Sequence, residues 1–458
     1  MPISEKNLLK LANGSDVRGV SIEGVADEPV TLNAEAANRI TSGFLDFLSQ
    51  KTGKRVKDLR IAVGHDSRLS APMLKEAVLE ALTYAGAVTV DCGLASTPSM
   101  FMSIVFPETK MDGSIMITAS HLPFNRNGLK FFTKDGGVEH EDIIAILEAA
   151  ARSPEVKGDL AKVQKYNLID RYCHHLRKKI RAALNMGDTP LRGMHVVVDA
   201  GNGAGGFFAT QVLGRLGADT SGSIFLEPDG HFPNHIPNPE NKQAMAAILA
   251  PDYPGSTIVT DSVTSDELTE FLQGELGLRH LRFKRGYKNV IDECIRLNKA
   301  GTVSPLAIET SGHGALSENY YLDDGAYLAV KLLIAAAKAK AQGRHLADLV
   351  KKLGEPVESR EYRMKIMGED DFRGYGENVL KVFEERAAEA GIRAAKPSYE
   401  GVRLVFPNGW ALLRMSLHDP QMPLNIESRK KGGVAEIAAK VQEFLKGFTS
   451  LDMSVFKD

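Results

Sequence analysis

Residues 60–68 read Arg60-Ile-Ala-Val-Gly-His-Asp-Ser-Arg68, a short β-branched run that ends in a polar turn. Helical periodicity follows this turn, and residues 195–203 and 257–262 repeat the apolar run with its turn. A buried parallel strand that leads into a helix has this signature. The repetition of such units predicts an α/β fold, in which helices cover parallel or mixed sheets.

The C-terminal part of the chain has a different pattern. Residues 402–405 and 410–415 are typical of two strands, and the turn Pro407-Asn408-Gly409 joins them. Residues 432–445 have the periodicity of a closing helix. This order of elements predicts a smaller α+β domain at the C-terminal end.

Length and composition narrow the class of protein. The 458 residues suggest about three or four domains. A net charge of -2 gives no reason to expect nucleic acid as a partner. The 3 cysteines are far apart in the sequence, which favours a reduced compartment over a disulfide framework. No apolar stretch approaches the roughly 20 residues needed to cross a bilayer. We therefore expect a cytoplasmic protein that binds neither nucleic acid nor membrane.

Residues 115–130 contain a candidate nucleophile. An apolar strand leads into a turn that presents the hydroxyl of Ser120 and the imidazole of His121, and the ammonium of Lys130 follows Gly128. A serine that carries a phosphoryl group needs cationic and hydrogen-bonding neighbours, because the group brings about two negative charges. Spacing alone leaves open a surface loop with a solvated serine.

The same stretch carries a resemblance to a known family. Thr118-Ala-Ser-His121, with Pro123 and Asn127-Gly-Leu-Lys130, resembles the phosphoserine loop of the α-D-phosphohexomutases, the family of phosphoglucomutases and phosphomannomutases. The Asn that usually follows the His is Leu122 here. The resemblance implies that Ser120 is phosphorylated in the resting enzyme and both donates and accepts the transferred group, with His121 and Lys130 as catalytic neighbours.

Further motifs extend the resemblance along nearly the whole chain in the family's order. Gly14-Ser-Asp-Val-Arg-Gly19 resembles the opening motif, which implies that Arg18 lies near the phosphoserine. The other matches to the first two domains are at residues 64–68, 97–98, 198–203 and 227–240. The last of these is a loop rich in proline, and ordered loops of this kind often serve a site.

Two motifs imply contacts with the sugar. Lys288 ends an element that resembles the family's Gly-x-Lys, which implies charge stabilisation or proton transfer; a solvated lysine is the alternative. Glu309-Thr-Ser-Gly-His313 resembles the sugar-recognition loop. Side chains two residues apart on an extended segment point the same way, so Glu309 and Ser311 would bind neighbouring hydroxyls. His313 either braces this loop or contacts substrate.

The last domain holds the candidate phosphate ligands. Arg414-Met-Ser416 resembles the start of the family's phosphate-binding motif, although Leu417 and His418 replace its Asn-Thr pair. An arginine can bind a phosphate through two parallel hydrogen bonds. Arg414 and Ser416 would therefore hold the phosphate that does not react, and Arg403 would add a second cation. A strand with one surface arginine is the alternative.

The family's metal-binding loop is missing from the sequence. The family holds Mg²⁺ with an Asp-x-Asp-x-Asp-Arg run in its second domain, and the chain contains no such run. Ser120 is then the one expected metal ligand, through its phosphoryl oxygen. The strands at residues 196 and 257 are also much closer together than those at 61 and 196, which predicts an abbreviated second domain.

Other acidic and histidine residues do not replace this loop. The spacing of Asp252, Asp261 and Asp266 does not rebuild the run of ligands. His231 and His235 lie in the proline-rich loop, where a spacing of four residues does not place them on one helical face. We therefore interpret this histidine pair as a coincidence.

The resemblance implies an α/β protein with three related α/β domains, the second abbreviated, and a C-terminal α+β domain, four domains around a central cleft. The expected domains are residues 1–155, 156–250, 251–365 and 366–458. We expect a monomer or homodimer, and the sequence leaves the choice between them open.

The expected activity is the interconversion of hexose 1-phosphate and hexose 6-phosphate, with glucose or mannose as the sugar. The family uses Mg²⁺ and a hexose 1,6-bisphosphate intermediate that also serves as activator. Two alternatives stay open: a homologue or truncated gene product that only binds sugar phosphate, and a phosphatase.

Overall fold

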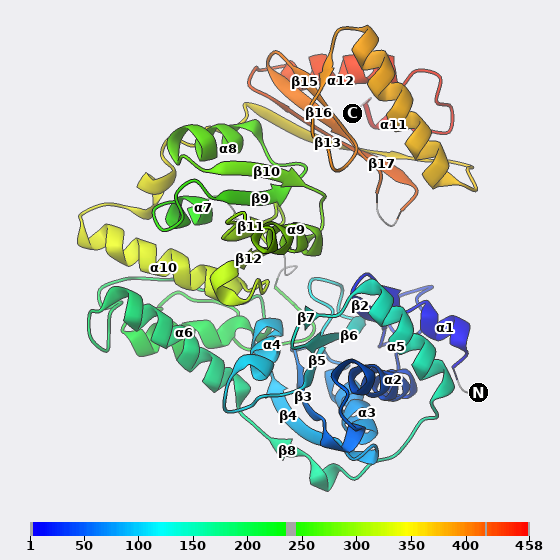
Figure 1. The fold of residues 1–458 in the computed structure, drawn as a ribbon, viewed down its shortest axis with the longest axis vertical. Helices are drawn as coiled ribbons and strands as arrows, with labels where there is room; N and C mark the ends of the chain where they lie inside the picture. The colour runs from blue at the N-terminus through cyan, green and yellow to red at the C-terminus, as the bar shows by residue number, and fades with distance from the viewer. Residues whose placement is uncertain (1–2, 235–243, 417–418, 457–458) are drawn as a thin grey trace. The chain divides into compact units, whose positions relative to one another are not determined.

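The computed structural model describes residues 3–234, 244–416 and 419–456. The chain forms two compact units, Met1–Pro239 and Glu240–Asp458. Each unit contains its own sheets and its own hydrophobic core (Figure 1). The predicted division into four domains is finer than these two units and stays a prediction.

The first unit is built on an eight-stranded mixed sheet with the order β1-β2-β6-β5-β3-β4-β8, in which β7 pairs with β6. Strands β3, β4 and β5 are parallel, and β6 runs antiparallel to both β5 and β2. The strands are β1 (Ala12–Asn13), β2 (Asp16–Val20), β3 (Arg60–His65), β4 (Val88–Leu94), β5 (Gly113–Ile117), β6 (Arg126–Thr133), β7 (Gly136–Gly137) and β8 (Gln164–Lys165).

Helices lie on both faces of this sheet. The helices of the first unit are α1 (Glu5–Leu9), α2 (Ala34–Thr52), α3 (Ala71–Tyr84), α4 (Thr97–Val105), α5 (His140–Arg152) and α6 (Leu168–Leu184). Ile61 and Val63 of β3 join one core with α2, α3 and α5. Gly64 faces the other way, where a Cβ atom would lie 2.5 Å from the sulfur of Met100 in α4. Burial on both faces explains the continuous apolar run of β3, so the predicted parallel strand is confirmed.

The strand predicted at residues 195–203 is wrong as a regular strand. His195 and Asp199 form isolated parallel bridges to Asp219 and Ile224, and Val197 is 54% exposed. A buried parallel strand needs ladder partners on both sides, and these bridges reach one neighbouring segment. The helical segment that follows is also irregular, with a π-helical stretch at Phe208–Leu213 between two 3₁₀ turns.

The second unit begins with a four-stranded sheet of order β10-β9-β11-β12. Strands β9, β10 and β11 are parallel and β12 is antiparallel, so the strand predicted at 257–262 is confirmed. The strands are β9 (Thr257–Asp261), β10 (Arg279–Phe283), β11 (Leu306–Ile308) and β12 (Gly314–Leu316). The helices around them are α7 (Ala244–Leu249), α8 (Asp266–Glu270), α9 (Tyr287–Lys299) and α10 (Gly325–Ala341).

The remainder of the second unit is an antiparallel five-stranded sheet of order β13-β17-β16-β15-β14. Its strands are β13 (Glu358–Lys365), β14 (Arg393–Ala394), β15 (Val402–Phe406), β16 (Gly409–Leu413) and β17 (Gln421–Ser428). Helices α11 (Phe372–Glu389) and α12 (Gly433–Phe444) share its core. The predicted hairpin and the α+β character of this region are both confirmed. Within the described residues, none of the helices is long and apolar enough to cross a membrane.

Candidate functional site

Ser120 lies in the turn between β5 and β6 and is exposed. Its φ of 53° is in the left-handed region, which residues with a side chain rarely adopt unless their surroundings hold them there. The hydroxyl of Thr118 accepts the Ser120 N–H at 3.1 Å and donates to Asp66 Oδ2 at 2.7 Å. Hydrogen bonds on the N-terminal side of the turn therefore hold the serine in its unusual conformation.

Arg68 holds the other side of the same turn. Arg68 lies three residues after the end of β3 and is only 1% exposed. Its two Nη atoms donate to four backbone carbonyl oxygens in the turn, those of Ser120, Leu122, Pro123 and Arg126, at 2.7 to 2.9 Å. Burial lowers the pKa of Arg68, and Asp66 opposes this effect. The sequence indicated Arg68 only as part of a motif, and its role in holding the nucleophile turn was missed.

Two cations flank this turn. Arg18 Nη1 donates to the Thr118 carbonyl at 3.3 Å, and Arg18 Nη2 lies 2.8 Å from Asp16 Oδ2. Lys130 Nζ lies 2.7 Å from the other oxygen of Asp16. Sheet register sets this arrangement, because Arg18 pairs with Gly128, where a Cβ atom would lie only 2.3 Å from the Val17 carbonyl. Arg18 and Lys130 carry two positive charges, and Asp16 carries one negative charge. A net positive charge therefore remains beside the turn and can bind an anion.

His121 is the imidazole nearest in sequence to the nucleophile. Its Nδ1 lies 3.5 Å from Ser120 Oγ, which is long for a hydrogen bond. Both side chains are exposed. The structure thus places His121, Arg18 and Lys130 around the Ser120 turn, and their catalytic roles stay predictions.

The described part of the proline-rich loop packs against the turn after β3. A Cβ atom on Gly230 would lie 2.5 Å from the Ser67 carbonyl, and the Phe232 ring lies 5.3 Å from the Arg68 guanidinium carbon. His231 Nδ1 is 2.8 Å from Asp229 Oδ1. His235 lies outside the described residues. The loop therefore covers the arginine that holds Ser120.

The described residues do not fit a Mg²⁺ site of the family's kind. Over residues 3–234, 244–416 and 419–456, no three His, Cys, Asp or Glu side chains gather closely enough to hold a metal ion. Asp261 accepts hydrogen bonds from Thr264 and Thr310, and Asp266 pairs with Arg282 and Arg403. The carboxylates of Asp261 and Asp266 are therefore already bonded to protein groups. A Mg²⁺ site needs carboxylates and waters in a near-octahedral arrangement around the ion.

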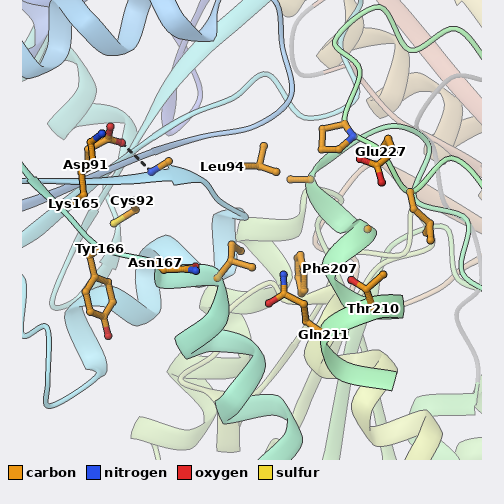
Figure 2. Close-up of a pocket in the computed structure, with 16 residues that line it drawn as sticks. Asp91, Cys92, Leu94, Lys165, Tyr166, Asn167, Phe207, Thr210, Gln211 and Glu227 are labelled. Atoms are coloured by element: carbon orange, nitrogen blue, oxygen red, sulfur yellow. Dashed lines mark hydrogen bonds between the residues drawn. The ribbon is translucent and has the colours of Figure 1, made fainter. Parts of the chain in front are cut away.

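A cavity of about 680 Å³ in the first unit lies away from the predicted site residues. The end of β4, the start of α6 and the irregular helix near Phe207 line it, as Figure 2 shows. Asp91 accepts the Gly93 N–H at 2.8 Å at one side of it, and Glu227 lies at the other. None of the sequence-predicted site residues lines this cavity.

The predicted sugar loop connects β11 and β12 in the second unit. Glu309 is only 5% exposed; its Oε1 accepts the Gly286 N–H at 2.5 Å and its Oε2 accepts the Ser311 hydroxyl at 3.0 Å. Burial raises the pKa of Glu309, and the Gly286 N–H opposes this effect. The Thr310 hydroxyl donates to the buried Asp261 at 2.5 Å. The Glu309 carboxylate is therefore fixed in place before any ligand binds.

His313 is the last residue of this loop, and Lys288 lies in α9. His313 Nδ1 is 2.9 Å from Ser311 Oγ, and its ring stacks on Tyr287 with centroids 5.3 Å apart. These contacts favour the bracing role for His313. Lys288 directly follows Tyr287 in the first turn of α9, where its Nζ lies 3.2 Å from Asp292 Oδ1. Its predicted part in the chemistry stays a prediction.

Arg414 directly follows β16 and is 6% exposed. Its Nη1 lies 3.9 Å from Glu400 Oε1. Burial lowers the pKa of Arg414, and Glu400 opposes this effect. Ser416 follows on the same segment, and its hydroxyl accepts the Asp419 N–H at 3.3 Å. Residues 417–418, which replace the family's Asn-Thr pair, lie outside the described residues.

Arg403 has several protein partners. It donates to the carbonyls of Ser262 and Thr264 at 3.1 and 3.3 Å, and pairs with Asp266 at 3.0 Å. Its guanidinium carbon lies 3.6 Å from the centre of the Trp410 ring system. Burial, helped by Arg282, lowers the pKa of Arg403 to about 10. These contacts favour a structural role for Arg403, which links β15 to the segment after β9. Its predicted role in substrate binding stays a prediction.

The structure thus groups the predicted residues by unit. Ser120, His121, Arg18 and Lys130 come together in the first unit. In the second unit, Glu309, Ser311 and His313 form one cluster and Arg414 lies beside Glu400. A cleft shared by both groups stays a prediction.

Comparison with curated proteins finds relatives that are named as sugar-phosphate mutases. A curated phosphomannomutase/phosphoglucomutase of Pseudomonas syringae pathovar tomato is 27% identical, covering 94% of this chain and 94% of the relative. The aligned length of 475 exceeds the 458 residues of this chain, so the alignment opens gaps in it. A probable phosphoglucosamine mutase of Methanocella arvoryzae is 26% identical over 89% of this chain and 95% of the relative.

A solved structure shows the same fold. The crystal structure of a phosphoglucomutase/phosphomannomutase family protein from Burkholderia thailandensis matches with a TM-score of 0.76 and 24% identity, covering 96% of this chain and 98% of the other. Family models for phosphoglucomutase/phosphomannomutase α/β/α domains I, II and III match residues 10–156, 170–251 and 241–356. These matches cover more than half of the chain. The protein therefore belongs to the phosphoglucomutase/phosphomannomutase family of the α-D-phosphohexomutase superfamily.

Proposed function

We propose that this protein is a phosphohexomutase that interconverts hexose 1-phosphate and hexose 6-phosphate, with Ser120 as the carrier of the phosphoryl group. The proposal rests on the structure of the turn around Ser120, where neighbouring residues fix the backbone and supply positive charge. Arg68 and Thr118 fix its backbone, and Arg18 supplies positive charge beside it. The names of the curated relatives favour this activity over binding alone.

The proposed reaction has two balanced transfers. In the first, a hydroxyl oxygen of a hexose monophosphate attacks the phosphorus of phosphorylated Ser120. The bond from phosphorus to Ser120 Oγ breaks as the new bond to the sugar forms. The proton of the sugar hydroxyl passes to a base, Ser120 Oγ takes up a proton as it leaves, and the product is a hexose 1,6-bisphosphate. In the second, Ser120 Oγ loses its proton to a base and attacks the phosphorus of the other phosphate. The bond from that phosphorus to the sugar oxygen breaks, the sugar oxygen takes up a proton, and the other hexose monophosphate leaves while Ser120 is phosphorylated again. We propose that His121, whose Nδ1 lies 3.5 Å from Ser120 Oγ, is the base that receives the serine proton.

Charge neutralisation is the main requirement of such transfers. Arg18 and Lys130, which share Asp16, would stabilise the phosphoryl oxygens at Ser120. In the second unit, Glu309 and Ser311 would bind two sugar hydroxyls, and Arg414 would bind the phosphate that does not react. Family membership is consistent with dependence on Mg²⁺. Since the described residues do not fit that ion, no step here is assigned to it.

The substrate class follows from the same proposal. We infer that the sugar is glucose or mannose, and that a hexose 1,6-bisphosphate loads Ser120 and so activates the enzyme. We also propose a cytoplasmic location and a monomeric or homodimeric state.

The test is a coupled assay of the full chain with glucose 1-phosphate and with mannose 1-phosphate, each with a trace of the matching 1,6-bisphosphate. We expect hexose 6-phosphate to form, and the Ser120→Ala variant to form none. Binding of the sugar phosphate without turnover would instead support the alternative of a binding protein. Steady release of inorganic phosphate would identify a phosphatase.

A further inference from the structure

In the second unit, the loop before β15 lies against the loop before α9. The Tyr399 ring packs on Phe283 at the end of β10, with ring centroids 4.9 Å apart. Gly401 has a φ of +59°, and a Cβ atom there would lie 2.1 Å from the Leu413 carbonyl. A residue with a side chain does not fit this approach. These two contacts fix Glu400, which lies between Tyr399 and Gly401 in the chain.

The Glu400 carboxylate faces two different groups with its two oxygens. Oε2 accepts hydrogen bonds from the Ser262 hydroxyl and from the Arg285 N–H, the latter at 3.0 Å. Oε1 faces Arg414 Nη1 at 3.9 Å. The side chain is only 11% exposed. One oxygen therefore anchors the carboxylate to residues that follow β9 and β10, and the other faces the guanidinium.

Arg414 retains unused hydrogen-bonding capacity beside this carboxylate. Its Nε is buried and has no hydrogen-bond partner among the residues that the structure describes. A guanidinium presents five donors, and one edge of it can bind two oxygens of a phosphate. A buried donor without a partner is costly, so the unsatisfied Nε at this position points to a ligand. Glu400 faces Nη1 of the guanidinium and leaves Nε unsatisfied.

The same peptide segment also contacts the sugar loop. The Arg285 N–H donates to Glu400, and the next N–H along the chain, that of Gly286, donates to Glu309 Oε1 at 2.5 Å. Two consecutive amides therefore hold the carboxylate beside Arg414 and the carboxylate of the sugar loop. This contact fixes the spacing between the two candidate binding groups.

We propose that Glu400 is a positioning residue, which orients Arg414 to bind the phosphate monoester of the substrate and sets its distance from Glu309. The proposal rests on the proposed function for the identity of the substrate. Glu400 acts through Arg414 and does not contact the reacting atoms. A carboxylate that only repelled an incoming phosphate would have the opposite effect, since its removal would strengthen substrate binding.

The test compares Glu400→Gln with Glu443→Gln, a change at an exposed residue that pairs with Lys440. Glutamine can still accept hydrogen bonds from Ser262 and Arg285 but carries no charge toward Arg414. We expect Glu400→Gln to raise the KM for glucose 1-phosphate about tenfold with kcat changed less than about threefold, because the phosphate is bound alike in ground state and transition state. The thermal midpoint should match that of the control.

Kinetic constants for Glu400→Gln that equal those of the control would overturn the inference while leaving the mutase activity intact, and so would a lower KM. If Glu400→Gln does not fold, Ser262→Ala replaces it and should raise KM about threefold through the loss of one anchoring hydrogen bond. An unchanged KM would then overturn the inference.

If the unmodified chain shows no turnover, the proposed function fails and calorimetric binding of glucose 6-phosphate decides the inference. We expect about tenfold weaker binding by Glu400→Gln than by the unmodified chain, following the same loss of orientation. Equal affinities, or no binding by either protein, would overturn it.

Discussion

Arg68 Nη2 donates a hydrogen bond to the backbone carbonyl of Ser120, with the two atoms 2.8 Å apart. The candidate nucleophile is thus held through its main chain by a buried cation from a neighbouring strand end. The side chain of Ser120 remains exposed, so the hydroxyl is available while its backbone is fixed. Phosphoryl transfer depends on the correct position of the reacting groups, and a backbone that is fixed in advance provides that position.

Replacing Arg68 should lower the stability of the first unit. Arg68→Ala leaves four part-buried backbone carbonyls without this donor, so we expect the free energy of unfolding to fall by roughly 2–5 kcal/mol. Urea denaturation followed by circular dichroism measures this change. Arg55→Ala, at a pair on the surface of the same unit, is the control and should leave the midpoint unchanged. Equal midpoints for both variants would show that the Arg68 contacts do not hold the turn.

Lys130 should act on the rate of the chemistry. Lys130→Met removes one of the two cations beside Ser120, and we expect kcat to fall about 10² to 10³-fold, as for the loss of one transition-state donor. KM should change little, because the proposed contact strengthens with the developing charge. Steady-state kinetics on glucose 1-phosphate give both constants. Lys51→Met, whose ammonium pairs with Asp135 on the surface, should behave like the unmodified chain.

Replacing Arg403 should mainly lower stability, whereas replacing Arg414 should mainly weaken substrate binding. Lysine cannot reproduce the planar fork of arginine. Arg403→Lys should therefore lower the thermal midpoint by about 5 °C or more while KM changes less than about threefold. Arg414→Lys should raise KM for the sugar phosphate about tenfold or more. Differential scanning fluorimetry and kinetics on the pair test this, and a reversed pattern would assign the phosphate to Arg403.

Glu427 should make the stability of the second unit depend on pH. Burial, with Glu267 nearby, raises the pKa of Glu427 to about 7 from its ordinary value of 4.5. The folded state therefore binds the proton more tightly than the unfolded state. The resulting stabilisation is complete below pH 4.5 and is lost as pH rises to about 7.

The neutral variant Glu427→Gln should remove this dependence. We expect it to be more stable than the unmodified chain at pH 8, by roughly 1–3 kcal/mol, and closely similar at pH 4.5. Glutamine can still accept the hydrogen bond from Trp410 Nε1. Unfolding in urea at the two pH values measures the difference. A variant that is less stable at pH 8 would contradict the raised pKa.

Much of the fold could be predicted because its strands carry their own pattern. The segments of β3 and β9 each have a buried apolar centre, at residues 61–63 and 258–259. A strand covered on both faces produces this pattern locally. The segment at residues 195–203 has the same local pattern but lacks regular pairing. Pairing depends on neighbouring strands that are distant in sequence, so the apolar pattern alone misled the prediction there.

The site could be predicted only in part for a related reason. Ser120, Lys130 and Glu309 lie in motifs whose residue types indicate their chemistry. Arg68 and Glu400 act on groups far along the chain, with Glu400 meeting the Arg285 amide 115 residues away. A contact of this kind with a backbone group leaves no trace in the identity of the partner residue. The structure was needed to assign both.

The most direct measurement is the intact mass of the full chain after incubation with glucose 1,6-bisphosphate. The account predicts a gain of one phosphoryl group, located on Ser120 by fragmentation, lost again on addition of hexose monophosphate, and absent in Ser120→Ala. No gain in mass, or an equal gain in Ser120→Ala, would contradict the central claim that this hydroxyl carries the transferred phosphate.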